Sequence, residues 1–147
     1  MQIALGGWTS ANYAAMACAD YPLCQGQLMP ADLDWSHAFV FNRELGQTSD
    51  GQMLSLQTLT AIHWTHRSFA LLVLAACVAF SLRMKHQDDT RPMGNLLLVA
   101  VVVQVLLGIS NVWLQWPLFL AVLHNTGAAA LLAVAVYTTV QLQRAKS

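Results

Sequence analysis

Residues 59–82 read LTAIHWTHRSFALLVLAACVAFSL, and this stretch decides the fold because it has the length and apolar character of a membrane-spanning helix. A helix needs about 20 mainly apolar residues to cross the hydrocarbon core of a bilayer. Two further apolar stretches of similar length follow, at residues 95–113 and 118–140. The sequence therefore predicts three full transmembrane helices.

The composition of the whole chain supports this prediction. Of 147 residues, 56% are hydrophobic and only 10% are charged, whereas a typical soluble domain is about 25% charged. A chain with so few charges cannot cover a globular surface in water, so the lipid bilayer must cover part of it. The net charge of zero argues against nucleic acid as a partner. No basic segment follows Met1, so we expect no secretory signal.

The connections between the spans set their directions. A polar loop at residues 85–92 joins the first two spans, and a turn at residues 115–117 joins the last two, so neighbouring spans must be antiparallel. Lys and Arg are retained on the cytoplasmic side. Five such residues fall on one side of the membrane: Arg83, Lys85, Arg91, Arg144 and Lys146. Trp113 and Trp116 then mark the opposite, outer interface, as aromatic belts do.

These observations predict an all-α integral membrane helix bundle in four segments. Residues 1–17 are the outer end of a truncated transmembrane helix, the first of a four-helix bundle. Residues 18–58 form an extracytoplasmic loop, residues 59–142 hold the three full spans, and residues 143–147 are a cytoplasmic tail.

The cysteines agree with this topology. Cys18 and Cys24 bracket a short segment on the oxidising side of the membrane, where a disulfide fits both the spacing and the compartment. The alternative is a pair of free thiols. Cys77 lies inside the first full span, where we expect a small buried residue.

Three of the five histidines lie within predicted spans, where ionisable side chains are costly and usually functional. His66 and His124 both lie roughly 10 Å below the outer surface, at 1.5 Å of rise per residue. Their spans run in the same direction and are diagonal in an up-down bundle of four helices. Two imidazoles at one depth favour a haem bound between them, which makes residues 59–142 a predicted haem-binding bundle. The alternative is that these histidines hydrogen-bond between helices.

Two neighbours of His66 complete the candidate site. His63 shares its helix face and offers a third ligand or, as we prefer, a hydrogen bond to a haem propionate, the backbone or water. Arg67 needs an anionic partner, which haem propionates would supply; the alternative is that it reaches lipid headgroups. Zinc fits less well, because no Asp or Glu lies inside a full span.

Small and polar residues on the later spans suggest close packing. Gly108, Ser110 and the run at residues 127–130 allow close helix packing or the approach of a flat ligand. Gln104 and Asn111 lie seven residues apart on one helix face, where they can line a polar core.

Four motifs in series closely resemble the C-terminal half of haem A synthase in its proteobacterial form. They are Gln2-Ile-Ala-Leu-Gly-Gly-Trp-Thr-Ser, Cys18-Ala-Asp-Tyr-Pro-Leu-Cys-Gln-Gly, His63-Trp-Thr-His-Arg and Leu123-His-Asn-Thr-Gly-Ala. Their order and spacing match over nearly the whole chain.

The resemblance implies an oxidoreductase of the bacterial inner membrane, with a periplasmic loop 18–58 and a cytoplasmic C-terminus. That family oxidises a methyl group of haem O to the formyl group of haem A, for cytochrome oxidase assembly. Its C-terminal half holds haem b and iron between two histidines, which correspond to His66 and His124. His63 stands where the catalytic half has a glutamate, which favours a cofactor or electron-transfer role.

The resemblance also implies partners: the missing N-terminal catalytic half or a homologous chain, and haem O synthase. Without that half we expect no activity from this chain alone, and we assign no catalytic residue. Two alternatives stay open, namely a stand-alone b-type membrane cytochrome and a non-catalytic remnant that holds no haem.

Overall fold

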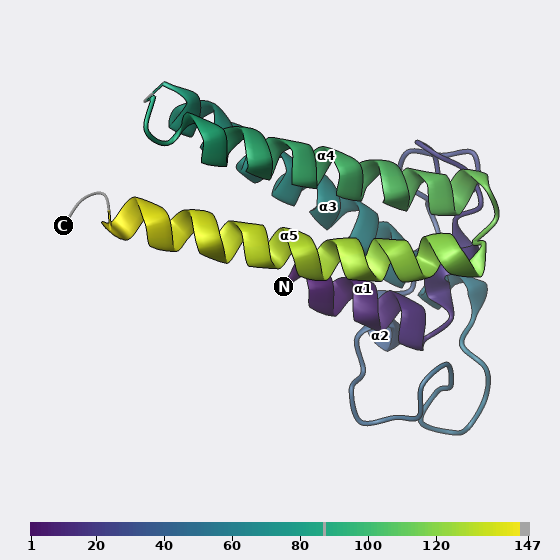
Figure 1. Ribbon diagram of the computed structural model, residues 1–147. Coiled ribbons are helices and arrows are strands. Elements are labelled where there is room, and N and C mark those ends of the chain that lie inside the picture. Colours follow the sequence, from purple (N-terminus) through teal and green to yellow (C-terminus); the bar gives the residue numbers. More distant parts are fainter. Residues whose placement is uncertain (87, 145–147) are drawn as a thin grey trace. The chain divides into compact units, whose positions relative to one another are not determined.

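The computed structural model describes residues 1–86 and 88–144. Within these residues the chain is helical and has no named β-strand, which confirms the all-α prediction. The helices are α1 (Gln2–Ala11), the 3₁₀ helix η1 (Ala14–Ala17), α2 (Trp35–Ala38), α3 (Leu56–Lys85), α4 (Arg91–Trp113) and α5 (Leu118–Arg144) (Figure 1). Lys146 and the rest of the predicted tail beyond residue 144 lie outside the described residues.

The helices α3, α4 and α5 are each long and apolar enough to cross a membrane. The predicted spans 59–82, 95–113 and 118–140 each lie within one of them, so the prediction of three full spans is confirmed. Large apolar side chains point outward from all three helices, among them Leu72, Val99 and Leu132. Contact with lipid is favourable for such apolar side chains, whereas contact with water is not. The chain is therefore a multi-pass membrane protein.

Local hydrogen bonds and one proline mark the ends of these helices. Ser55 precedes α3, and its Oγ accepts a hydrogen bond from the Thr58 backbone N–H at 3.2 Å, as an N-cap does. Pro92 lies in the first turn of α4, where a missing N–H does no harm. After α4, the N–H of Trp116 donates to the Asn111 carbonyl at 2.8 Å, which closes the helix and begins the turn into α5.

The chain divides into two compact units. The first consists of Met1–Ala70 and Val112–Gln115, and the second consists of Leu71–Asn111 with the residues from Trp116 onward. In the first unit, α1 lies against the early part of α3. Its buried apolar core lies near the start of α3 and consists of Ala14, Ala38, Leu54, Ala61 and Ile62.

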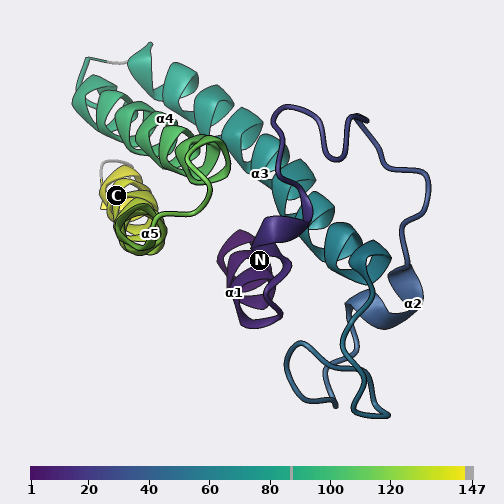
Figure 2. The same cartoon turned by 90° about the vertical axis from the view of Figure 1, so that its right-hand side faces the viewer.

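The long loop of the first unit is tied to the end of α1. Trp8 Nε1 donates to the Ala38 carbonyl at 2.8 Å. The fully buried Asn12 accepts hydrogen bonds at its Oδ1 from Arg43 Nη1 at 3.0 Å and from the Gly46 N–H at 3.2 Å. In Figure 2 the chain runs from η1 round to α2 and returns to the start of α3. These bonds give the loop a defined path although it has little regular structure.

The second unit contains two helix hairpins. Thr90 Oγ1 donates to the Met84 carbonyl at 2.7 Å and closes the connection between α3 and α4. Asn111 Nδ2 lies 3.4 Å from the Leu120 carbonyl oxygen, to which it donates across the turn between α4 and α5. Both hairpins are antiparallel (Figure 1), as the short connections predict.

Gly94 permits the closest approach in the first hairpin. A Cβ at this buried position would lie 2.8 Å from the Ser81 carbonyl oxygen and 3.0 Å from Met84 Cβ. We therefore expect Gly94→Ala to lower the free energy of unfolding by about 1–3 kcal/mol, as overpacking does. Thermal unfolding in detergent micelles measures the effect. Gly7→Ala is the control, because a Cβ at that position would meet no atom within 4 Å; equal loss of stability in both variants would contradict the prediction.

Candidate functional site

His66 lies on α3 in the first unit and is held from α1. The side-chain amide nitrogen of Gln2 lies 3.2 Å from His66 Nδ1 and donates to the His66 carbonyl oxygen at 3.1 Å. An amide NH₂ group can only donate, so Nδ1 is the acceptor. Gly6, one turn further along α1, lies beside the same ring: a Cβ there would be 3.1 Å from His66 Cε1. The ring therefore lies against bare backbone.

His124 lies on α5 in the second unit and has matching neighbours on α4. The amide nitrogen of Gln104 lies 3.2 Å from His124 Nδ1 and 3.0 Å from the His124 carbonyl oxygen. A Cβ at Gly108 would be 3.0 Å from His124 Cε1. Gly127 is in turn needed by Gln104, because a Cβ at residue 127 would collide with Gln104 Oε1.

The two histidines thus share one pair of neighbours, a glutamine and a glycine, although they belong to different units. In each case a glutamine and a glycine four residues later lie on one face of a neighbouring helix, the glutamine at Nδ1 and the glycine at the ring edge. Gln104 was predicted from the sequence to line a polar core, whereas the roles of Gln2 and Gly6 were not predicted. The repeated spacing Gln-x-x-x-Gly was the signal that could have found them.

His63 lies in the first unit with His66 and Arg67. It is only 5% exposed. Its Nδ1 is buried without a hydrogen-bond partner among the described residues. The hydrogen bond to a propionate, the backbone or water that we preferred for His63 from the sequence stays a prediction, as does its role as a third ligand.

Arg67 holds the loop that the disulfide closes. The structure contains the predicted disulfide between Cys18 and Cys24. Both cysteines are buried. Arg67 Nη1 donates to the Asp20 carbonyl at 3.0 Å, and Nη2 donates to the carbonyls of Pro22 and Leu23 at 3.1 and 3.0 Å. Its guanidinium also lies 5.1 Å from the centre of the Tyr21 ring. Backbone carbonyls and an aromatic face thus satisfy this cation here, and its predicted contact with haem propionates stays a prediction.

Asp20 stabilises the same loop from within. Its two carboxylate oxygens accept hydrogen bonds from the backbone N–H groups of Gln25 at 2.7 Å and Gly26 at 2.8 Å. Burial alone would raise the pKa of Asp20, but these N–H donors and the nearby charge of Arg67 outweigh it and hold the pKa below its ordinary value. The carboxylate therefore stays ionised at neutral pH.

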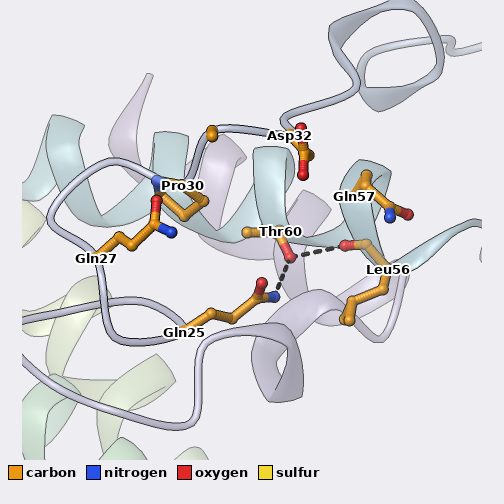
Figure 3. Close-up of a pocket in the computed structure, with 8 residues that line it drawn as sticks. Gln25, Gln27, Pro30, Asp32, Leu56, Gln57 and Thr60 are labelled. Atoms are coloured by element: carbon orange, nitrogen blue, oxygen red, sulfur yellow. Dashed lines mark hydrogen bonds between the residues drawn. The ribbon is translucent and has the colours of Figure 1, made fainter.

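A small polar cavity of about 110 Å³ lies between this loop and the start of α3 (Figure 3). Gln25 reaches across one edge of it, where its Nε2 donates to Thr60 Oγ1 at 2.8 Å and to the Ala17 carbonyl at 3.1 Å. Thr60 Oγ1 itself donates to the Leu56 carbonyl at 2.7 Å. These hydrogen bonds connect the disulfide loop to α3, so the polar residues that line the cavity stabilise the fold.

Asp34 anchors the start of α3 to the outer loop. Its carboxylate accepts hydrogen bonds from the Ser36 backbone at 3.0 Å, Thr58 Oγ1 at 2.8 Å and His37 Nδ1 at 2.8 Å. The hydrogen bond from the Ser36 hydroxyl lowers the pKa of Asp34 more than any other contact. Burial raises this pKa, but the bonds from Ser36, His37 and Thr58 together outweigh burial and hold the pKa well below the ordinary range.

The depressed pKa of Asp34 gives a stability prediction with a definite sign. A carboxylate that ionises more easily in the folded state adds stability above its unfolded pKa of about 3.9, and this stability is lost as the pH falls further. We expect Asp34→Asn to lower the melting temperature at pH 7 and to weaken its dependence on pH below about 4. Thermal unfolding across this range measures both effects. Asp50→Asn, at an exposed loop position, is the control, and a wild-type acid profile in Asp34→Asn would contradict the assignment.

Cys77, the remaining cysteine, is free and only partly buried, so it is more accessible than we expected from the sequence.

The positions of metal-ligating side chains bear on a zinc site. Among residues 1–86 and 88–144, no group of three or more His, Cys, Asp or Glu side chains is arranged to hold a metal ion. A structural zinc site of the usual four protein ligands is therefore not formed by the described residues.

Comparison with known proteins identifies the family. Residues 1–136 match the family model COX15-CtaA, described as cytochrome oxidase assembly protein. The chain is 37% identical over 135 residues to the Heme A synthase of Shewanella oneidensis, which covers 92% of this chain and 41% of that protein. It is 32% identical over 136 residues to the Heme A synthase of a Caulobacter species, covering 91% of this chain and 36% of that protein.

The chain therefore spans only about two-fifths of the length of the curated relatives it matches, a share consistent with the predicted partial C-terminal half. No solved structure matches it. Three membrane-spanning helices, the serial motifs and these relatives agree, and the chain belongs to the COX15-CtaA family of cytochrome oxidase assembly proteins, the haem A synthase family.

Proposed function

We propose that this chain is the haem b-binding part of a haem A synthase, in which His66 and His124 would hold the iron of one haem. The observation that carries the proposal is the matching environment of the two rings. Each has Nδ1 engaged by a glutamine amide and its edge against a glycine. Metal-bound histidines commonly make a hydrogen bond at the ring nitrogen that does not bind the metal, which orients the other nitrogen toward the metal. A glutamine amide stands at that ring nitrogen in both histidines.

The surrounding residues fit such a ligand pair. Both histidines are partly buried, so each ring is held in place but not enclosed. Gly6 and Gly108 themselves place no side chain against the ring edges. A bis-histidine haem needs no carboxylate or thiolate ligand, which agrees with the absence of Asp and Glu from the three predicted spans. The bound haem would supply one-electron transfer.

The chain's own residues would position that cofactor and shield it. In our proposal His66 and His124 hold the iron, Arg67 and His63 lie on the helix turn that meets the haem edge, and the disulfide loop covers the outer side. The oxidation of the haem O methyl group belongs to the N-terminal half of the complete enzyme. This chain alone is then inactive, and it exchanges electrons with that half or with a homologous chain.

The proposal includes an orientation and two partners. The loop at residues 18–58 faces the periplasm and the C-terminus faces the cytoplasm, in the inner membrane of a bacterium. The distribution of Lys and Arg supports this orientation. Haem O synthase is the partner that would deliver the substrate to the complete enzyme.

Spectroscopy of the purified chain tests the function. We expect the dithionite-reduced protein, expressed in a haem-producing host, to give the α-band of a low-spin b-type haem at about one haem per chain. Co-expression with an N-terminal half and haem O synthase should then yield extractable haem A. If the chain binds no haem, the result would support the alternative that it is a non-catalytic remnant. Haem b without haem A in the co-expression would favour a stand-alone cytochrome.

A further inference from the structure

We propose that Gln2 and Gln104 are positioning residues that set the tautomer and orientation of His66 and His124. We propose further that each glutamine amide rotates by a half-turn about its last side-chain torsion when its histidine binds iron. The second part rests on the proposed function, whereas the first concerns the protein without haem. Gln2 and Gln104 come from different units and different helices, so the two sites are independent observations of one arrangement.

The geometry of the two contacts is nearly identical. In both, the amide nitrogen lies 3.2 Å from Nδ1 and 3.0–3.1 Å from the carbonyl oxygen of the same histidine. One amide therefore grips the ring and the backbone of one residue, which restricts rotation of the ring. In both, a glycine one turn later lets the ring edge lie against the helix backbone.

The direction of the hydrogen bond fixes the tautomer. Because the amide nitrogen donates, Nδ1 carries no proton, and the proton of a neutral imidazole must be on Nε2. A histidine that binds iron through Nε2 needs the opposite arrangement, with a proton on Nδ1 and an acceptor facing it. The haem-free and ligating forms of these histidines therefore require opposite hydrogen-bond partners at the same place.

The same amide can supply both partners. Gln2 Oε1 and Gln104 Oε1 are buried and have no hydrogen-bond partner among the described residues. A half-turn about the last side-chain torsion exchanges the oxygen and the nitrogen, and this torsion is broad and roughly two-fold. After the turn, Oε1 accepts from Nδ1–H. The unpaired oxygen gains a donor, while the amide nitrogen gives up its bond to the histidine carbonyl and moves to the position where the oxygen had no partner.

This mechanism predicts how substitutions change the haem. An acceptor at Nδ1–H raises the basicity of the imidazole, which favours ferric over ferrous iron and lowers the reduction potential. Gln→Leu removes the acceptor and should raise the potential, while the affinity for haem falls about 10–100-fold, the usual effect of losing such a partner. Gln→Glu offers a stronger acceptor and should lower the potential below that of the wild type.

The experiment uses the full chain and the variants Gln2→Leu, Gln2→Glu, Gln104→Leu and Gln104→Glu, with Gln141→Leu on α5 as the control. Redox titration, transfer of haem to apomyoglobin and thermal unfolding are measured on each. We expect opposite shifts of potential for Leu and Glu at both positions and none at residue 141. Shifts of the same sign for Leu and Glu, or equal effects at residue 141, would overturn the proposal, because a purely structural role does not reverse sign with the acceptor.

A second measurement needs no haem. Nitrogen-15 NMR of histidine-labelled, haem-free protein should show the Nε2–H tautomer at His66 and His124, and a mixture of tautomers at the affected residue in each Leu variant. Unchanged tautomers in the Leu variants would reject the positioning role. If the wild-type protein takes up no haem, both the proposed function and the rotation of the amide are rejected. The measured tautomers would still decide whether Gln2 and Gln104 position the two histidines in the haem-free protein.

Discussion

Replacement of His66 or His124 by alanine is expected to remove the low-spin b-type haem spectrum and to lower haem affinity by more than the about 10–100-fold that the loss of a hydrogen bond to a ligand costs. Haem would dissociate more readily once one of the two residues that would hold its iron is removed. Each histidine is also contacted by its own glutamine and glycine, neither of which can replace an imidazole as an iron ligand. Absorption spectra of the reduced proteins, with haem content from the pyridine haemochrome, measure the effect.

The controls for this prediction come from the same chain. His37→Ala and His86→Ala change exposed histidines outside the three predicted spans and should leave the spectrum unchanged. Added imidazole should restore part of the low-spin signal in the alanine variants by occupying the vacated position. An α-band that survives in His66→Ala or His124→Ala would remove that residue from the ligand set.

Replacement of Arg67 by leucine is expected to release the Cys18–Cys24 loop and to lower the free energy of unfolding by about 2–4 kcal/mol. Each hydrogen bond from a charged donor contributes about 1.5–3 kcal/mol, and partial exposure reduces the sum. The variant loses three bonds to loop carbonyls and the contact with Tyr21. Limited proteolysis of haem-free protein measures the release of the loop, and thermal unfolding measures the stability.

Two further variants sharpen the test. Arg67→Lys keeps the charge but replaces a planar fork by a single ammonium group, so it should restore only part of the stability. Arg91→Leu is the control, because Arg91 is exposed and lies 3.8 Å from the exposed Asp88, a pair that contributes at most about 1 kcal/mol. A protected loop together with a lower haem content in Arg67→Leu would instead favour the predicted contact with haem propionates.

The surroundings of His66 could be predicted only in part from the sequence. Ionisable residues within an apolar stretch identify His63, His66 and Arg67 as unusual without any structure, because their burial in lipid is costly. Their partners were not evident from the sequence. Gln2 is separated from His66 by 64 residues, and the carbonyls that accept from Arg67 are backbone groups that every residue type carries.

The outer loop was also predicted only in part. The spacing and compartment of Cys18 and Cys24 predicted their disulfide, which the structure contains. The bonds that fix the rest of the loop involve Asn12, Arg43 and Asp34, whose residue types are ordinary in loops. A loop of this kind has no periodicity from which pairing can be inferred, so its path follows only from the contacts themselves.

The sequence by itself determined that this protein crosses the membrane with three helices and carries histidines inside them. Helix length, apolar content and the cost of burying polar groups are local properties, readable along the chain. Only the tertiary structure decided that a glutamine and a glycine from a neighbouring helix hold each of His66 and His124. The physical reason is that a hydrogen bond depends on positions to within a few tenths of an ångström, and packing between helices sets those positions.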